Sequence, residues 1–495
     1  MKLFAPIIKD AYKIGHKDQY KEGTEYVYSN LTARSGNHSN IPNSRGVIWL
    51  GLQFVIKDIL INTWNDTFFN QDKDTVVAKY KRIVSNVLGY SVDASHMEEL
   101  HDLGYLPVHI KALPEGSFVP YGVPMMTIVN THPKFYWVTN MLETMISAET
   151  WGMVTSATTY YEYRKNFIKY AKLTGAPLEG VPFQGHDFSM RGMSSSLSAA
   201  TSSFAALAAG SYGTDTLPAI QIAEEYYGAN SNTEIVGMSV NATEHSVMCS
   251  HGKEDEIKTF HTLITETYPE GILSIVSDTW DFWKVVTDYL PKLKPTILAR
   301  EGKVVIRPDS GNPVDIICGV QNDPILIPTD PEYRGLIECL WDTFGGTINE
   351  KGYKVLDEHI GAIYGDSITL ERQKQILSRL ESKGFCSSNI VLGIGSYTYQ
   401  YVTRDTHGMA IKATNVVIGG ESIPIFKDPK TDDGTKKSAK GLLRVSLNNR
   451  GQYELRDDVS SYMETESNQL KTVFHNGSLV TETSLTKIRT IIEEN

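Results

Sequence analysis

The chain has 495 residues and a mass of 55.2 kDa, which is too long for one ordinary domain, so two or three lobes are expected. A composition with 41% hydrophobic and 21% charged residues is typical of a globular protein, and a formal net charge of -11 argues against general nucleic-acid binding. The four cysteines are far apart and form no CxxC pair, so neither a zinc site nor a disulfide framework is indicated. No stretch resembles a signal peptide or a membrane-spanning helix, and we expect a soluble protein of the cytoplasm.

The first part of the chain, residues 1–150, is predicted to form an α+β domain. Arg45–Leu60 is apolar enough for a buried helix or a buried strand, and its periodicity does not decide between them. His109–Thr131 is punctuated by proline and glycine, which predicts short strands. Phe135–Leu173 contains good helix formers and no internal proline, so it predicts one long helix that leads into a second domain.

Residues 151–400 repeat a pattern of apolar strand, polar residues and helix, with steps of about 30 residues, the length of one βα unit. One longer step leaves room for an insertion around residues 321–354. This pattern predicts an α/β fold, an incomplete (β/α) barrel of about seven strands whose carboxyl ends face one rim. An open doubly wound sheet is the alternative. The polar groups that follow the predicted strands are HDF (186–188), GTD (213–215), NATEH (241–245), SIVSD (274–278), RPDSG (307–311), YGDS (364–367) and GIGS (393–396).

Two helices are predicted between these strands, one over 194–210, whose small residues suit close packing, and one over 253–268, whose first turn is acidic. Residues 401–495 return to mixed β character and end in the helical tail LTKIRTIIEEN. We expect this last segment to pack with the N-terminal domain. The lysine-rich stretch Lys427–Gly441 is interpreted as a solvated loop.

The polar groups at the strand ends are the candidate site. In VVIRPDSGN (304–312), a β-branched strand runs into Arg307 and Asp309; a plain turn with a solvated ion pair is an equal alternative for this strand end alone. Walker A, GxSxG and HExxH motifs are missing from the sequence. Acids combined with arginine, histidine and one aromatic side chain suit a ligand that carries a phosphate and a flat ring. His245, directly after Glu244, is a candidate for proton or phosphoryl transfer, with a structural histidine as the alternative.

Eight motifs, HDFSMRG, GTDT, ATEHS, IVSDTWD, IRPDSGNP, YGDS, TRD and IFKDP, occur in an order that resembles nicotinamide phosphoribosyltransferases, most closely the bacterial and phage branch. The resemblance covers essentially the whole chain. It implies an enzyme that joins nicotinamide to phosphoribosyl pyrophosphate, giving nicotinamide mononucleotide and pyrophosphate, the salvage entry to NAD.

The resemblance implies a role for each matching residue on the nicotinamide side. Phe188 would stack on the pyridine ring, with the partner subunit's Tyr12 on its other face. Asp215 would accept the carboxamide N–H, and Arg307 would donate to the carboxamide oxygen. A carboxylate at this position repels nicotinate, which is the reason for expecting nicotinamide rather than nicotinate.

The resemblance also implies roles on the phosphoribosyl side. Asp309 and Asp366 would hold the ribose, directly or through Mg²⁺, and stabilise the charge that develops as pyrophosphate leaves. His245 would be phosphorylated by ATP, with Glu244 orienting it. The protein would act as a homodimer with shared active sites, without nucleic-acid or membrane partners. The remaining implied substrate contacts are Arg191, Gly395 and Ser396 at the 5′-phosphate, Arg34, Arg404, Lys412 and Lys427 at the phosphate and pyrophosphate, and Ser277, Asp281 and Gly365.

Two features depart from the family pattern or have no assigned role. Where animal members carry a run of glycines, this chain has GIGSYTYQ, with Ser396 and Tyr397 replacing two of them, so the backbone approaches a phosphate less closely there. The insertion near Pro324–Lys351 has no assigned role. Two other functions stay open, a nicotinate phosphoribosyltransferase of the same fold and a non-catalytic ligand-binding homologue.

Overall fold

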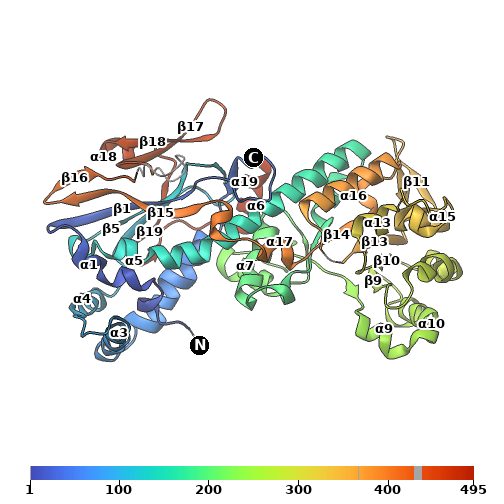
Figure 1. Cartoon of the computed structure of the whole chain (residues 1–495), viewed down its shortest axis with the longest axis horizontal. Coiled ribbons are helices and arrows are strands. Elements are labelled where there is room, and N and C mark those ends of the chain that lie inside the picture. The colour runs from blue at the N-terminus through green and yellow to red at the C-terminus, as the bar shows by residue number, and fades with distance from the viewer. Residues whose placement is uncertain (1, 321, 366, 428–437) are drawn as a thin grey trace. The chain divides into compact units, whose positions relative to one another are not determined.

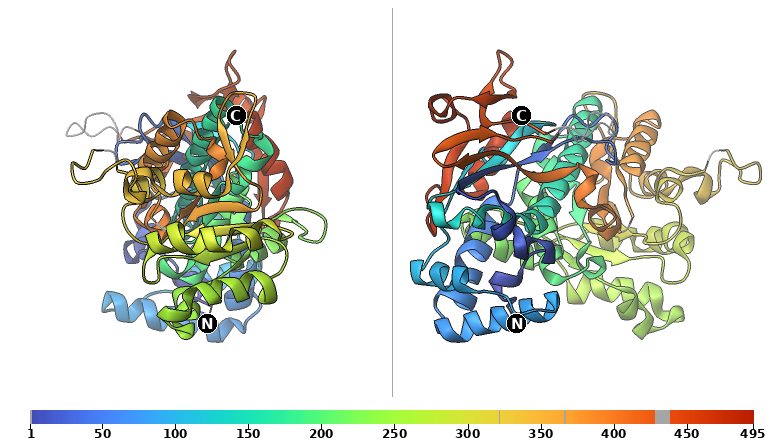
Figure 2. Two further views of the ribbon diagram at one scale, coloured as in Figure 1. Left: turned by 90° about the vertical axis from the view of Figure 1, so that its right-hand side faces the viewer. Right: turned by 60° about the vertical axis from the view of Figure 1, so that its left-hand side comes forward.

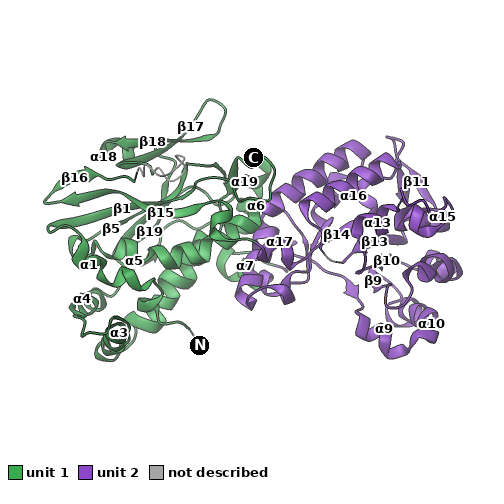
Figure 3. Cartoon of the chain, in the orientation of Figure 1, with its two compact units in different colours: residues 1–158, 221–230, 402–495 green, residues 159–220, 231–401 purple. Residues whose placement is uncertain are grey.

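The computed structural model describes residues 2–320, 322–365, 367–427 and 438–495. The chain forms two compact units (Figure 3). Unit 1 comprises Met1–Thr158, Gln221–Asn230 and Val402–Asn495, and unit 2 comprises Thr159–Ile220 and Ser231–Tyr401. The boundaries near residues 158 and 401 lie close to the predicted domain limits at 150 and 400.

The short segment 221–230 belongs to unit 1, which no sequence pattern predicts. The hydroxyl of Tyr227 donates to the buried Glu115 over 2.9 Å, and the carbonyl of Tyr226 accepts from Gln53 over 2.6 Å. Side chains from distant parts of the chain therefore attach this segment to unit 1, and such contacts leave no local pattern in a sequence.

Unit 1 is built on a seven-stranded antiparallel sheet with the strand order β16-β15-β1-β5-β3-β19-β20. β1 lies between β5 and β15, as the blue β1 beside the orange β15 shows in Figure 1. The N-terminal strands β1, β5 and β3 form the middle of the sheet, and C-terminal strands lie on both sides of them. The predicted mixed domain made of both chain ends is confirmed. The strands are β1 (Thr24–Ala33), β3 (Val108–Ala112), β5 (Pro124–Asn130), β15 (Met409–Ile418), β16 (Glu421–Pro424), β19 (Lys471–His475) and β20 (Ser478–Leu479).

The apolar run Arg45–Leu60 is a strand followed by a helix. β2 (Gly46–Ile48) pairs with β4 (Phe118–Pro120), and helix α2 (Leu52–Phe54) continues as a π-helix over Val55–Thr63. Gly51 separates them with a φ of 104°, a value that glycine adopts without strain.

Helices α3 and α4 lie on one side of the large sheet of unit 1, and the β17–β18 hairpin lies on the other (Figures 1 and 2). α3 begins where Asp72 accepts from the Thr75 N–H and ends at Gly89 in the left-handed region. The predicted long helix is present as α5 and α6, and α19 confirms the predicted helical tail. The helices are α1 (His16–Gln19), α3 (Lys73–Leu88), α4 (Ser95–Leu103), α5 (Val138–Met141), α6 (Glu143–Thr174), α8 (Pro218–Tyr227), α18 (Ser461–Thr465) and α19 (Leu485–Glu494), of which α6 and α8 continue into unit 2.

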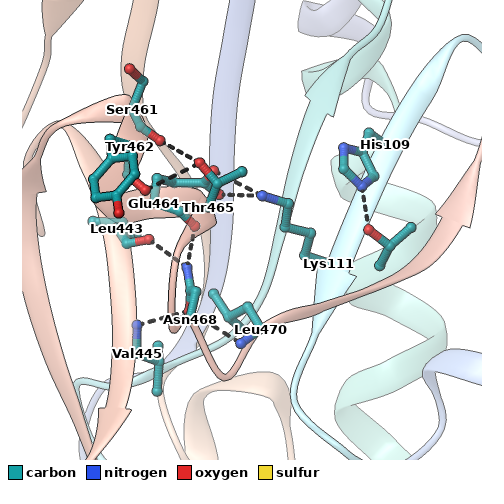
Figure 4. Close-up of polar contacts among 11 residues, drawn as sticks. His109, Lys111, Leu443, Val445, Ser461, Tyr462, Glu464, Thr465, Asn468 and Leu470 are labelled. Carbon is teal, nitrogen blue, oxygen red and sulfur yellow. Dashed lines mark hydrogen bonds and ion pairs between the residues drawn. The ribbon is translucent and has the colours of Figure 1, made fainter.

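Asn468 fixes the hairpin formed by β17 (Leu442–Leu447) and β18 (Tyr453–Val459) (Figure 4). Its side chain is buried, accepts from the N–H groups of Val445 and Leu470, and donates to the carbonyls of Leu443 and Glu464. Lys111 of β3 forms a bidentate ion pair with the Glu464 carboxylate at 2.8 and 2.9 Å. The hairpin is therefore attached to the sheet by satisfied polar groups.

Unit 2 is built on seven parallel strands in the order β7-β6-β14-β13-β10-β9-β8. The first of these strands in the chain, β6, pairs with the last, β14, which is the pairing that curls a sheet toward a barrel. β7 and β8 are the two ends of the strand order, and an isolated bridge joins Gly213 of β7 to Met238, shortly before β8. The predicted incomplete barrel is confirmed, and the alternative prediction of an open doubly wound sheet is wrong. The strands are β6 (Gly185–Asp187), β7 (Gly213–Thr214), β8 (Asn241–Ala242), β9 (Leu273–Val276), β10 (Val304–Arg307), β13 (Ile360–Tyr364) and β14 (Val391–Ile394).

The helices of unit 2 follow the strands as expected. α7 is rich in small residues, begins with a capping box between Ser195 and Ser198, and buries most of its length. The insertion forms α14, α15 and the small pair β11 (Gly346–Ile348) and β12 (Lys354–Leu356). Among the described residues, no helix is both long and apolar enough to cross a membrane. The helices are α7 (Ser196–Ala208), α9 (His245–His251), α10 (Glu256–Thr262), α11 (Phe282–Lys284), α12 (Leu290–Leu298), α13 (Pro313–Cys318), α14 (Pro331–Arg334), α15 (Leu336–Phe344), α16 (Leu370–Ser382) and α17 (Ser396–Gln400).

Candidate active site

The interior of the half-barrel holds a cavity of about 720 Å³, lined by residues of all seven strands. Its lining is largely apolar, and Phe188, Asp215 and Arg307 supply an aromatic ring and two opposite charges where strands β6, β7 and β10 end. Ligand sites in proteins are typically cavities of this size with a few placed polar groups. All three side chains were predicted from the sequence as contacts of one ring-shaped ligand.

Asp215 is held by two neighbours at the edge of this cavity. His186 Nε2 lies 2.8 Å from Asp215 Oδ1, and the Ser239 hydroxyl donates to the same oxygen. Burial raises the pKa of Asp215, but the hydrogen bonds from His186 and Ser239, with the charge of Arg307, outweigh it and leave the pKa below its ordinary value. The carboxylate is therefore kept ionised.

Arg307 is 9% exposed and its guanidinium is fixed from two sides. Nη2 donates to the Thr243 carbonyl over 2.7 Å, and Nε lies 3.4 Å from Asp309 Oδ1. The end of β10 therefore places Arg307 at the cavity, and the turn that follows places Asp309 beside it.

His245 lies at the start of α9 among side chains from two other strand ends. Its Nδ1 is 3.2 Å from the Thr279 hydroxyl, and its Nε2 is 3.7 Å from Asp278 Oδ1 and 3.9 Å from Asp309 Oδ2. The imidazole is 49% exposed, so a ligand reaches it from solvent. Glu244, predicted to orient His245, instead accepts a hydrogen bond from Ser246.

Asp278 is the central carboxylate of this cluster, with a side chain only 4% exposed. Its Oδ2 accepts from the Asp309 N–H and from the Ser310 hydroxyl, while its Oδ1 is buried and has no hydrogen-bond partner in the described part of the chain. The motif SIVSD predicts Asp278 at a strand end but assigns it no role. The importance of Asp278 comes from its burial and from its hydrogen bonds with the loop that carries Asp309, and the sequence IVSD shows neither.

Two glycines permit close approaches at the rim. A Cβ on Gly365 would lie 1.8 Å from Asp309 Oδ1, and a Cβ on Gly192 would lie 2.0 Å from Ser396 Oγ. The turn that carries Arg191 therefore lies against the start of α17, where Gly395 is the N-cap residue. The structure brings Arg191, Gly395 and Ser396, the predicted 5′-phosphate contacts, into one place.

Two predicted substrate contacts have their side chains engaged within the protein, and one has no described position. Ser277 is fully buried, and its hydroxyl donates to the Ile275 carbonyl. Asp281 caps α11 by accepting from the Lys284 N–H. Asp366 lies outside the described residues.

The other predicted contacts belong to unit 1. Tyr12 is 64% exposed, Arg34 donates to the Gly408 carbonyl, and Arg404 pairs with Asp405. Burial and the positive charges of Arg34, Lys427 and Lys13 lower the pKa of Lys412, against the opposing effect of Glu143. Arg34, Lys412 and Lys427 are therefore neighbours in one basic cluster.

Comparisons with known proteins agree with one another. Residues 183–478 match the nicotinate phosphoribosyltransferase (NAPRTase) family. A nicotinamide phosphoribosyltransferase of Acinetobacter baylyi is 52% identical over 97% of this chain and 95% of its own length. Those of Mycoplasma pneumoniae and Xanthomonas campestris are 35% and 33% identical, covering 87% and 97% of this chain and 93% and 96% of their own lengths.

Solved structures show the same fold at low sequence identity. A nicotinate-nucleotide pyrophosphorylase from Pyrococcus furiosus is 16% identical with a TM-score of 0.60, covering 99% of this chain and 95% of its own. Human nicotinic acid phosphoribosyltransferase is 14% identical with a TM-score of 0.53, covering 98% and 93%.

Proposed function

Because the chain belongs to the nicotinate phosphoribosyltransferase (NAPRTase) family, and is thus an enzyme of phosphoribosyl transfer, we propose that it converts nicotinamide and phosphoribosyl pyrophosphate into nicotinamide mononucleotide and pyrophosphate for NAD salvage. The observation that carries the proposal is that Phe188, Asp215 and Arg307 line the same cavity. The pyridine nitrogen would form a bond to C1′ of the ribose while the bond from C1′ to the pyrophosphate oxygen breaks, with its electron pair leaving on pyrophosphate.

The choice of nicotinamide over nicotinate rests on Asp215. An ionised carboxylate accepts an amide N–H and repels a carboxylate, whereas Arg307 suits the oxygen of either ligand. The Asp215 side chain is 41% exposed, so water screens part of the repulsion. We expect a preference of roughly tenfold to a hundredfold, equivalent to about 1.4 to 2.8 kcal/mol.

Asp309 is proposed to stabilise the positive charge that develops on the ribosyl ring as pyrophosphate leaves. Its carboxylate lies 3.4 Å from Arg307 Nε, and its backbone N–H donates to Asp278. Asp366 is proposed to share this task. Arg191, Gly395 and Ser396 would bind the 5′-phosphate, and the basic cluster of Arg34, Lys412 and Lys427, with Arg404, would bind the other phosphates.

Magnesium is a proposed cofactor. In the described part of the chain, no three histidine, cysteine or acidic residues form a group able to hold a metal by themselves. Mg²⁺ commonly binds through one or two carboxylates when substrate phosphates supply other ligands. Asp278 Oδ1 is buried and accepts no hydrogen bond from the described residues, so together with the neighbouring Asp309 it fits that donor set. When bound, the ion would neutralise charge on the leaving pyrophosphate.

ATP is proposed to drive the reaction through a phosphorylated His245. A nitrogen of the imidazole would bond the γ-phosphorus as the bond to the ADP oxygen breaks, and water would later release phosphate from the histidine. Two observations support this role: the imidazole is half-exposed, so that a ligand reaches it from solvent, and it lies within 4 Å of Asp278 and Asp309.

We also propose that the protein is a homodimer and that it lies in the cytoplasm. The partner subunit's Tyr12 would cover the ring opposite Phe188, and the high exposure of Tyr12 in one subunit supports a contact with another. The four free cysteines suit a reducing compartment.

The test is a product assay with nicotinamide or nicotinate, each with phosphoribosyl pyrophosphate and Mg²⁺, with and without ATP. We expect mononucleotide from nicotinamide and a higher yield with ATP. Robust product from nicotinate together with none from nicotinamide would refute the proposal and favour the nicotinate enzyme of the same fold.

A further inference from the structure

His186 is a buried histidine that contacts both Asp215 and Phe188 of the candidate nicotinamide site. Its side chain is 11% exposed, its Nε2 lies 2.8 Å from Asp215 Oδ1, and its ring centroid lies 4.5 Å from that of Phe188. The proposed function gives tasks to Phe188 and Asp215 but none to the side chain between them.

The backbone is shaped to admit this imidazole. In the parallel pairing of β6 and β7, His186 lies opposite Gly213. A Cβ on Gly213 would lie 2.8 Å from His186 Nδ1 and 3.2 Å from the Gly185 carbonyl oxygen, both too close. Glycine at 213 therefore leaves the space through which the ring reaches Asp215, two residues further along the same chain.

The two oxygens of Asp215 have different surroundings. Oδ1 takes both protein contacts, one to His186 Nε2 and one from the Ser239 hydroxyl, whereas Oδ2 has no hydrogen-bond partner in the part of the chain that the structure describes. Two contacts at one oxygen fix the rotation of the carboxylate, since His186 is itself packed against Phe188. Oδ2 is left as the acceptor for a ligand.

We propose, on the basis of the proposed function, that His186 and Ser239 are positioning residues that fix Asp215 by one oxygen, and that this fixation sets the preference for a carboxamide over a carboxylate. With the contact removed, Asp215 is free to rotate, the amide N–H loses a fixed acceptor, and a competing carboxylate meets a charge that is able to move away.

Two substitutions separate hydrogen bonding from packing. His186→Leu keeps comparable bulk and removes the donor, and His186→Gln places an amide N–H near the position of Nε2. We expect His186→Leu to lower the ratio of kcat/KM for nicotinamide over kcat/KM for nicotinate by about tenfold, the value of one hydrogen bond to a charged group. His186→Gln should restore most of the ratio. Ser239→Ala should lower it by a smaller factor.

Gly213→Ala gives an independent geometric test, because the added methyl displaces the imidazole while His186 itself is retained. It should lower the ratio as His186→Leu does. In each variant the KM for phosphoribosyl pyrophosphate should stay within about twofold of the wild-type value, since damage to the whole site would change both substrates.

His359→Ala is the matched control. His359 also bonds an aspartate, Asp357, over 2.7 Å, but it precedes strand β13 rather than following a strand end. This variant should keep the wild-type ratio. An unchanged ratio in His186→Leu, or an equal loss in His186→Leu and His186→Gln, would overturn the inference. A wild-type protein that makes no product from nicotinamide would instead refute the proposed function, so the two failures are distinguishable.

Discussion

The backbone N–H of Asp309 donates a 2.9 Å hydrogen bond to Asp278 Oδ2, which joins the ends of the neighbouring strands β10 and β9. The Ser310 hydroxyl donates to the same oxygen. A buried carboxylate of the neighbouring strand end therefore holds the loop that carries Asp309.

Asp309→Ala should lower kcat at least about a hundredfold with the fold intact, because a carboxylate aimed at developing charge acts mainly in the transition state. Steady-state kinetics and thermal unfolding measure the two effects separately. Full activity in a folded variant would show that Asp309 has no such role.

Gly365→Ala should also reduce kcat, since its methyl would lie 1.8 Å from Asp309 Oδ1 and must displace that carboxylate. Gly152→Ala is the control, because a Cβ there meets nothing within 4 Å and alanine favours the helix α6. The control should be fully active and as stable as the wild type or up to about 1 kcal/mol more stable. Equal activity of the two variants would contradict the close approach.

His245→Ala should abolish the gain in mononucleotide yield that ATP gives to the wild type, because no other phosphate acceptor is proposed. The measurement is end-point product with and without ATP, together with ADP release. An ATP effect of wild-type size in this variant would remove the phosphohistidine from the mechanism.

His407 should make the protein less stable in mild acid. Burial lowers its pKa from 6.5 to about 4, and its Nδ1 lies 2.8 Å from the Tyr121 hydroxyl. Between pH 6.5 and pH 4 the unfolded chain binds the proton before the folded one, so stability falls as the pH falls through this range. The loss from this residue is on the order of 3 kcal/mol.

The measurement is chemical denaturation of the wild type and of His407→Gln at pH 7 and pH 4.5. The variant should show a smaller loss between these values, although His96 and His109, whose pKa values burial also lowers to about 4, keep part of the dependence. Identical losses would mean that His407 binds its proton equally well in the folded and the unfolded chain.

Asn468→Ala should destabilise unit 1 by roughly 2 to 4 kcal/mol, because it leaves the backbone groups of Val445, Leu470 and Leu443 buried without this partner. Denaturant unfolding followed by far-ultraviolet circular dichroism measures the change. Asn62→Ala, at an exposed position, serves as the control and should stay within about 0.5 kcal/mol. A comparable loss in both variants would refute the assignment.

The strand ends of the barrel could be predicted because a short apolar run followed by charged and turn-forming residues is a local pattern. Each of the seven predicted groups includes the carboxyl end of a strand, from His186–Phe188 to Gly393–Ser396. The apolar run Arg45–Leu60 could not be assigned from its period since it contains both a strand and a helix. Gly51 was the available signal.

The contacts between the site residues were harder to predict than which residues belong to the site. Glu244 is adjacent to His245 in the sequence, yet Asp278 and Asp309 are the described carboxylates within 4 Å of the imidazole. Which carboxylates lie near the imidazole depends on which strand ends are neighbours in the sheet, and not on which residues are adjacent in the sequence. The contact of His186 with Asp215 requires glycine at position 213, because a Cβ there would lie 2.8 Å from His186 Nδ1. No sequence pattern predicts this dependence.

The position of β1 between β5 and β15 has a consequence for biosynthesis. β15 begins at Met409, so during translation one edge of β1 has no neighbouring strand until most of the chain has left the ribosome. All seven barrel strands end by Ile394 and pair with one another, so unit 2 has its sheet available first. The nascent protein therefore carries an exposed β-edge for most of its synthesis, which makes this strand the point where chaperone binding or misassembly of truncated chains is expected.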